Sequence, residues 1–142
     1  MIQSVLSKNL IASYLCANYR IGTGPESISL RIDQYSEPLA KFLISTEQPC
    51  AAIISAYNPY SLRLSNEENC AAHESLRDFL NRHSCPIIEC LNTDPTGAWP
   101  EEKSFFVPGL DLYTSRSLGQ QFAQNAIVWI GSDAIPRLIL LR

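Results

Sequence analysis

The sequence predicts an α+β fold built on a ferredoxin-like βαββαβ core, which can form either a two-layer or a three-layer α/β sandwich. The first observation is the order of patterns in residues 50–130: strand, helix, strand, strand, helix, strand. The second is that the runs 50–56 and 126–130 are apolar at nearly every position, which indicates strands covered on both faces. An N-terminal helix, an N-terminal hairpin and a C-terminal extra strand complete the predicted fold.

The first part of the chain is predicted to contain two helices that flank a hairpin. Apolar residues at near-helical spacing predict a helix over residues 2–17. The segments 19–21 and 28–32 flank a Gly-Thr-Gly-Pro sequence that favours a turn, so we expect a β-hairpin. Ser36 can cap a second helix, which ends before Gln48.

Caps and breaks define the elements of the predicted core. Ser65 and Glu68 have the spacing of a capping box, in which each side chain satisfies a backbone N–H of the other residue, and Pro86 ends the helix that they start. Thr114 or Ser115 is expected to cap the second helix of the core. The expected strands are residues 50–57, 87–91, 104–107, 126–130 and 138–141.

Length and composition are typical of one globular domain over residues 1–142. Hydrophobic residues make up 46% of the chain and charged residues 18%, which excludes a disordered protein. The formal net charge is −3 and no run of basic residues occurs. We therefore expect neither nucleic acid nor a membrane surface as a partner.

The N-terminus and the cysteines indicate a cytoplasmic protein. Residues 1–17 contain a single Lys and an apolar stretch that polar residues interrupt, which makes a poor signal peptide. The five cysteines form no C-x-x-C pair, and their odd number leaves one over if the others pair. We expect free thiols in a reducing cytosol.

The directions of the predicted strands place several polar segments at one end of the sheet. A helical crossover keeps two strands parallel, whereas a direct connection reverses them. The exit of the first core strand, the start of its helix, the loop 92–103 and the end of the second helix should therefore meet. We predict a ligand-binding site there, formed by Asn58, Ser61, Asn66, Asn69, Glu102, Ser104, Gln124 and Asn125.

Each of these residues also has a purely structural interpretation. The Asn amides can orient a ligand, but Asn most often closes turns and caps helices. Glu101 or Glu102 could act as a general acid or base if burial raised its pKa, although adjacent Glu residues in a loop are usually solvated. The pair at 124–125 can simply end a helix.

Other chemistries find little support in the sequence. Cys70 and His73 share a helical face and could begin a metal site with His83 or Cys85, but no spacing is that of a zinc site, so no metal is expected. No glycine-rich phosphate loop precedes a helix, so no cofactor is expected. An RNA-recognition module would carry stacking aromatics on residues 103–107, but the glycines of that motif are missing.

Four stretches form a recognisable pattern: residues 56–61, the pair Asn66 and Asn69, residues 99–105, and Leu118-Gly119 followed by residues 122–129. From Tyr19 to the C-terminus the chain resembles an uncharacterised bacterial family, domain of unknown function 3293. The family pattern usually has Trp in place of Tyr57 and Gly in place of Ala123. The resemblance implies a bacterial, single-domain, cytoplasmic protein and carries no assigned activity.

Three classes of function fit the sequence. The preferred class is a small-molecule-binding or regulatory module that uses the amide-rich end of the sheet. The second is a hydrolase- or transferase-type enzyme with a Glu as acid or base, and the third is a protein–protein interaction domain. Fold analogy cannot choose among them, because this architecture hosts all three.

One face of the predicted sheet needs a cover, because the central strands are apolar on both faces. The candidates are the helix over residues 2–17 and a second copy of the chain. We favour the helix, because an intramolecular contact avoids the association entropy that a dimer must overcome. A monomer is therefore the expected state, with a homodimer as the alternative.

Overall fold

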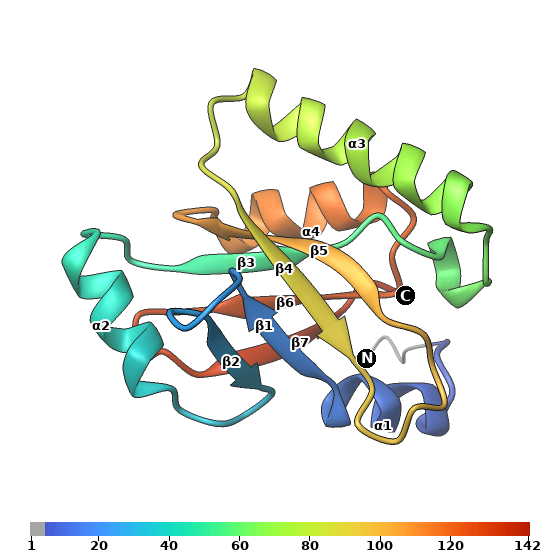
Figure 1. Ribbon diagram of the computed structural model, residues 1–142, viewed down its shortest axis with the longest axis horizontal. Helices are drawn as coiled ribbons and strands as arrows, with labels where there is room; N and C mark the ends of the chain where they lie inside the picture. The colour runs from blue at the N-terminus through green and yellow to red at the C-terminus, as the bar shows by residue number, and fades with distance from the viewer. Residues whose placement is uncertain (1–4) are drawn as a thin grey trace.

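A computed structural model describes residues 5–142 and confirms the α+β class (Figure 1). The helices are α1 (Lys8–Cys16), α2 (Glu37–Ser45), α3 (Asn66–Arg82) and α4 (Leu112–Gln121), with a short 3₁₀ helix η1 (Pro59–Ser61). The strands are β1 (Asn18–Ile21), β2 (Ile28–Arg31), β3 (Ala51–Ile54), β4 (Ile88–Thr93), β5 (Glu102–Pro108), β6 (Ala126–Ile130) and β7 (Pro136–Leu140).

All seven strands form one curled sheet in the order β2-β1-β4-β5-β3-β6-β7, and every neighbouring pair is antiparallel. The predicted hairpin forms from β1 and β2, and its turn places Gly22 at φ 77° and Gly24 at φ 79°, where glycine is favoured. The hairpin joins the sheet at β4, and the predicted C-terminal strand joins it at β6. The central strands β5 and β3 are therefore flanked on both sides.

The predicted cap of α3 is confirmed, and the predicted cap of α4 is wrong. The capping box is confirmed: Ser65 Oγ accepts from the Glu68 N–H at 3.1 Å, and Glu68 Oε1 accepts from the Ser65 N–H at 3.3 Å. The prediction that Thr114 or Ser115 caps α4 is wrong. Asp111 is the cap, because its carboxylate accepts from the Thr114 N–H at 2.7 Å and starts the helix at Leu112.

Several other boundaries differ from the prediction. The strand predicted over 50–57 is β3 at Ala51–Ile54, and the strand predicted over 138–141 is β7 at Pro136–Leu140. The loop predicted over 92–103 is shorter, because β4 extends to Thr93 and β5 begins at Glu102. Asn92 pairs with Glu102 at the end of this ladder, and four residues expected in the loop (92, 93, 102 and 103) belong to strands of the sheet. The N-terminal helix begins at Lys8 with Ser7 as its cap. The start predicted at residue 2 lies outside the described residues.

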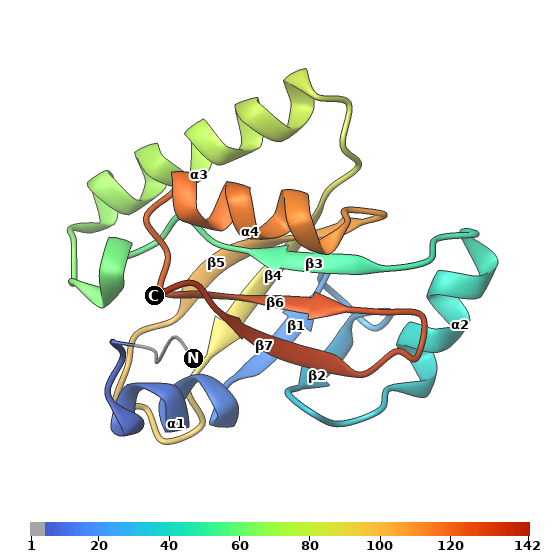
Figure 2. The same ribbon diagram turned by 180° about the vertical axis from the view of Figure 1, so that it is seen from behind.

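Helices cover both faces of the sheet, as Figures 1 and 2 show from opposite sides. On one face, Ala52 and Ile54 of β3 pack in a core with Leu76 and Leu80 of α3 and with residues of α4. On the other face, Ile53 packs in a second core with side chains of α2 and of the hairpin. Alternate residues of β3 therefore point into two different cores, which explains why the run is apolar throughout.

The helix that covers the second face of the sheet is not the predicted one. The helix α2 supplies it, with Leu39 0% exposed and Leu43 4% exposed, whereas α1 has no buried residue. The hairpin closes the same core with Tyr19 and Leu30, because the sheet curls at that edge. Helix α1 instead lies over one end of this face, where it forms a wall of the cavity described below.

Replacing Leu39 with Ala tests this assignment of the cover. We expect the substitution to lower the free energy of unfolding by about 2–5 kcal/mol, because it removes a fully buried side chain and leaves a cavity. Urea denaturation measures the loss. The controls are Ile44→Ala on the same helix and Leu15→Ala on α1, both at exposed positions, which should change stability by less than about 0.5 kcal/mol. An equal loss in Leu15→Ala would contradict the assignment.

Candidate functional site

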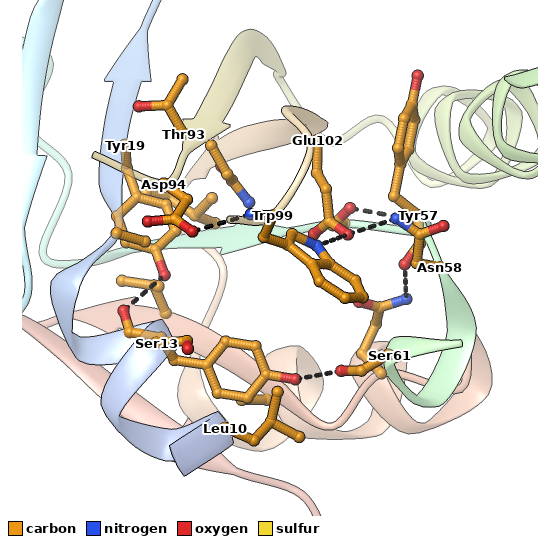
Figure 3. A pocket seen from close by; sticks show the side chains of 18 of the residues that line it. Leu10, Ser13, Tyr19, Tyr57, Asn58, Ser61, Thr93, Asp94, Trp99 and Glu102 are labelled. Atoms are coloured by element: carbon orange, nitrogen blue, oxygen red, sulfur yellow. Dashed lines mark hydrogen bonds between the residues drawn. The ribbon is translucent and has the colours of Figure 1, made fainter. Parts of the chain in front are cut away.

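A cavity of about 170 Å³ lies between α1, the sheet and the loop 94–101 (Figure 3). Its apolar walls include Ile53 of β3, Val128 of β6 and Leu138 of β7, together with Leu10 of α1 and Ala17. These strand positions face the α2 side of the sheet. The volume is similar to that of an engineered apolar cavity of about 150 Å³ that binds benzene. The space therefore suits a small organic molecule.

Asn58 organises the polar side of the cavity. It is 5% exposed, its Nδ2 donates to Glu102 Oε2 at 2.6 Å, and its Oδ1 accepts from the Leu64 N–H at 2.9 Å. Asn69 binds it twice, since Asn69 Nδ2 donates to Asn58 Oδ1 at 3.0 Å and Asn69 Oδ1 accepts from the Asn58 N–H at 2.9 Å. One buried amide thus fixes the exit of β3, the start of α3 and the start of β5.

Glu102 is the ionisable group at the centre of this network. Its Oε2 accepts from Asn58 and also from Trp99 Nε1, at 2.9 Å. Its Oε1 accepts no hydrogen bond from residues 5–142 and is not fully buried, so it can receive a donor from a bound molecule. Burial raises the pKa of Glu102, and the hydrogen bonds from Asn58 and Trp99 oppose that rise.

A second group of hydrogen bonds connects α1 to the same end of the sheet. The hydroxyls of Tyr14 and Ser61 share a hydrogen bond of 2.6 Å. Asn125 Nδ2 donates to Ser61 Oγ at 2.8 Å and to the Tyr14 hydroxyl at 3.3 Å. Arg142 Nη1 donates to Asn125 Oδ1 at 3.3 Å, and its guanidinium lies 4.2 Å from the ring centroid of Tyr60. The C-terminus therefore supports the wall that α1 forms.

The backbone at this end adopts left-handed conformations. Asn58 has φ 44°, Tyr60 has φ 53° and Ser61 has φ 60°. Asn tolerates this region better than Tyr and Ser do, so η1 stores strain at the rim of the cavity. The Tyr60 N–H donates to the carbonyl of Ala123 at 2.7 Å, and Ala123 itself has φ 56°.

The structure brings most of the predicted site residues together. Asn58, Ser61, Glu102 and Gln124 line the cavity. Asn69 and Asn125 hold these residues in place, and Ser104 donates to Oδ1 of Asn92, which also lines the cavity. Asn66 is different, because it lies exposed on the first turn of α3 and outside the network. Ligand binding by these residues stays a prediction.

Sequence reasoning missed the aromatic part of the cavity. Tyr14 and Tyr19 line it from α1 and β1, and Trp99 lines it from the loop. Trp99 could have been noticed, because a Trp between Gly97 and Pro100 in a polar loop has no strand or helix face to pack on. Tyr14 gave no local signal, since its hydrogen-bond partners lie far away in the sequence.

The histidine cluster considered as a metal site lies elsewhere. His73 is buried on the α3 side of the sheet, stacks on Phe105 at 4.2 Å between ring centroids, and places Nε2 3.4 Å from Glu89 Oε2. Burial lowers the pKa of His73. In residues 5–142 no three His, Cys, Asp or Glu side chains gather to hold a metal, and the five cysteines are free thiols.

Replacing Asn58 with Ala should destabilise the protein strongly. We expect a loss of about 2–4 kcal/mol, because buried partners lose their hydrogen bonds and Ala adopts a left-handed φ less readily than Asn. Chemical denaturation measures it. Asn66→Ala is the matched control and should stay within about 0.5 kcal/mol. Similar losses in the two variants would show that the network around Asn58 is not structural.

The raised pKa of Glu102 predicts a defined pH dependence of stability. In acid, Glu102 is protonated in both the folded and unfolded states. As pH rises through about 4.3, the unfolded carboxyl ionises before the folded one, so the folded state loses relative stability. The stability of Glu102→Gln relative to the wild-type protein should therefore increase between about pH 4 and pH 7. Thermal unfolding across this range measures it, and a falling difference would refute the assigned direction.

Comparison with known proteins gives one match. No curated protein and no solved structure matches the chain. Of the helices in residues 5–142, none has the length and apolar character that crossing a bilayer requires. The family described as "Protein of unknown function (DUF3293)" matches residues 54–127, a span that contains Asn58, Glu102 and Asn125. Because this match covers just over half of the 142 residues, the chain belongs to the DUF3293 family of proteins of unknown function.

Proposed function

We propose that the protein binds a small organic molecule in the cavity between α1 and the sheet. The observation that carries this proposal is Glu102, whose Oε2 is fixed by Asn58 and Trp99 while no donor from residues 5–142 reaches its Oε1. Ligand sites typically combine apolar walls with a few fixed polar groups. The cavity has both, since Ile53 and Val128 line it together with Glu102.

The fixed geometry around Glu102 also supports the proposal. Asn58 and Trp99 hold the carboxylate before any ligand arrives, so binding would require little ordering of the side chain. Ser61, which has a strained left-handed φ, lines the cavity, and the strained Tyr60 precedes it in the chain. Strained backbone is concentrated at binding sites in proteins, where the surrounding structure holds it in place.

Nuclear magnetic resonance can test for binding through the two tryptophan indoles. Trp99 Nε1 donates to Glu102 at the cavity, whereas Trp129 Nε1 donates to the carbonyl of Leu110 on the other face of the sheet. We expect small amphipathic compounds with one aromatic ring to shift the indole signal of Trp99 in a saturable way. The signal of Trp129 should not move.

A filled cavity provides the control for this experiment. Ala17 lines the cavity, so Ala17→Phe should occupy part of the space and abolish the shift of the Trp99 signal. Ala12→Phe places the same side chain on an exposed position of α1 and should leave binding unchanged. Failure of every compound to move Trp99, or binding that persists in Ala17→Phe, would refute the proposal.

An enzyme with Glu102 as general acid or base is the second candidate. The raised pKa of Glu102 favours it, as does an Oε1 that accepts no hydrogen bond from residues 5–142, because acid–base catalysis needs a proton carrier in reach of the substrate. Mass spectrometry of a bound compound before and after incubation distinguishes the two functions. A product whose formation is lost in Glu102→Gln would support an enzyme, and an unaltered compound would support a binding module.

The remaining proposals concern fold type, location and assembly. The strand order β4-β5-β3-β6, with α3 and α4 on one face, supports a ferredoxin-like unit within the larger sheet. Free thiols support a cytoplasmic location, where the surroundings are reducing. The cover that α2 provides supports a monomer, which gel filtration can distinguish from a homodimer.

A further inference from the structure

The charge of the cavity wall restricts the kind of ligand that can bind. Among the described residues that line the cavity, Asp94 and Glu102 carry carboxylates, and no Lys, Arg or His is present. A phosphate or carboxylate ligand would therefore meet negative charge without a compensating cation. Burying an unpaired anion next to another anion is strongly unfavourable.

The two carboxylates play different parts. Asp94 is used by its own loop, because its oxygens accept from Thr96 and from the Trp99 N–H at 2.9 Å. In the described part of the chain, donors reach Oε2 of Glu102 and none reaches its Oε1. A charged donor on the ligand could form a strong charge-assisted hydrogen bond with Oε1 of Glu102.

Aromatic rings provide a second feature that favours a cation. Tyr14, Tyr19 and Trp99 line the cavity, and Figure 3 shows the indole of Trp99 beside the carboxylate of Glu102. Aromatic faces attract ammonium groups through the ring quadrupole. The guanidinium of Arg63 lies 5.3 Å from the Trp99 ring centroid, but Arg63 is exposed and water screens its charge.

We propose that the ligand is a small primary amine, bound as its ammonium ion to Oε1 of Glu102, with an apolar body on Ile53, Val128 and Leu138. This inference rests on the proposed function and names its ligand class. The volume of about 170 Å³ limits the apolar body to about one phenyl ring. Protonation of Glu102 removes its negative charge, so amine binding weakens as pH falls through the pKa of Glu102.

Three ring compounds of equal size test the ligand class. Benzylamine, benzyl alcohol and benzoate are titrated into the full-length protein, and the Trp99 indole signal gives each dissociation constant. We expect benzylamine to bind about tenfold or more tightly than benzyl alcohol. Its ammonium donor is charged, and a hydrogen bond from a charged donor to a carboxylate is stronger than one from a neutral hydroxyl. Benzoate should bind most weakly.

A matched pair of variants identifies the carboxylate responsible. Glu102→Gln keeps an acceptor for Asn58 and Trp99 but removes the charge, so benzylamine should lose about tenfold in affinity while benzyl alcohol changes little. Glu101→Gln removes the same charge from an exposed neighbour and should leave both affinities unchanged. Retention of benzylamine binding in Glu102→Gln would overturn the inference.

The possible results distinguish a failure of the amine assignment from a failure of the proposed binding function. If benzyl alcohol or benzoate binds as tightly as benzylamine, and Ala17→Phe blocks that binding, the cavity is a binding site but the amine assignment is wrong. If none of the three compounds shifts the Trp99 signal, or Ala17→Phe fails to block them, both the function and the amine assignment are wrong. Tight, Glu102-dependent binding of benzylamine supports both.

Discussion

The buried amide of Asn58 is the interaction on which this end of the molecule depends. Its side chain and backbone N–H bind Asn69, Leu64 and Glu102, which belong to three separate segments. A buried amide without partners costs about 1–3 kcal/mol, so the left-handed turn, the start of α3 and the start of β5 must form together. The geometry of the cavity rim follows from the folding of the chain and needs no ligand to establish it.

Glu102 links this structural network to the proposed binding site. Its Oε2 accepts from Asn58 and Trp99, and the residue lines the cavity, so the same carboxylate holds β5 near Asn58 and would provide the charge of the proposed site. Burial destabilises the charged form of Glu102, and the hydrogen bonds from Asn58 and Trp99 offset only part of this effect. The pKa of Glu102 therefore remains raised. A cationic ligand would supply the missing counter-charge. The stability of the fold and the proposed preference of the cavity for a cation therefore have the same electrostatic origin.

The features that can be predicted from the sequence are those that a few neighbouring residues determine. The capping box at Ser65 and the apolar run of β3 are decided by neighbouring residues, and both appear in the structure. The start of α4 was misplaced, because Asp111 and Thr114 are both good caps and local propensity does not rank them. The cover of the second face was misassigned because α1 and α2 are both helices of nine residues, and the curl of the hairpin, a non-local property, decides which one packs there.

Helix α1 differs from the other walls of the cavity in how firmly it is held. Ile53 and Val128 are buried in strands with partners on both sides, whereas α1 buries no side chain and is held to η1 and Asn125 through the Tyr14 hydroxyl. Segments with few buried contacts open at a lower free energy than core strands do. Of these walls, α1 is therefore the one whose displacement costs least, and the proposed ligand would enter by moving it while the sheet and the Asn58 network keep their shape.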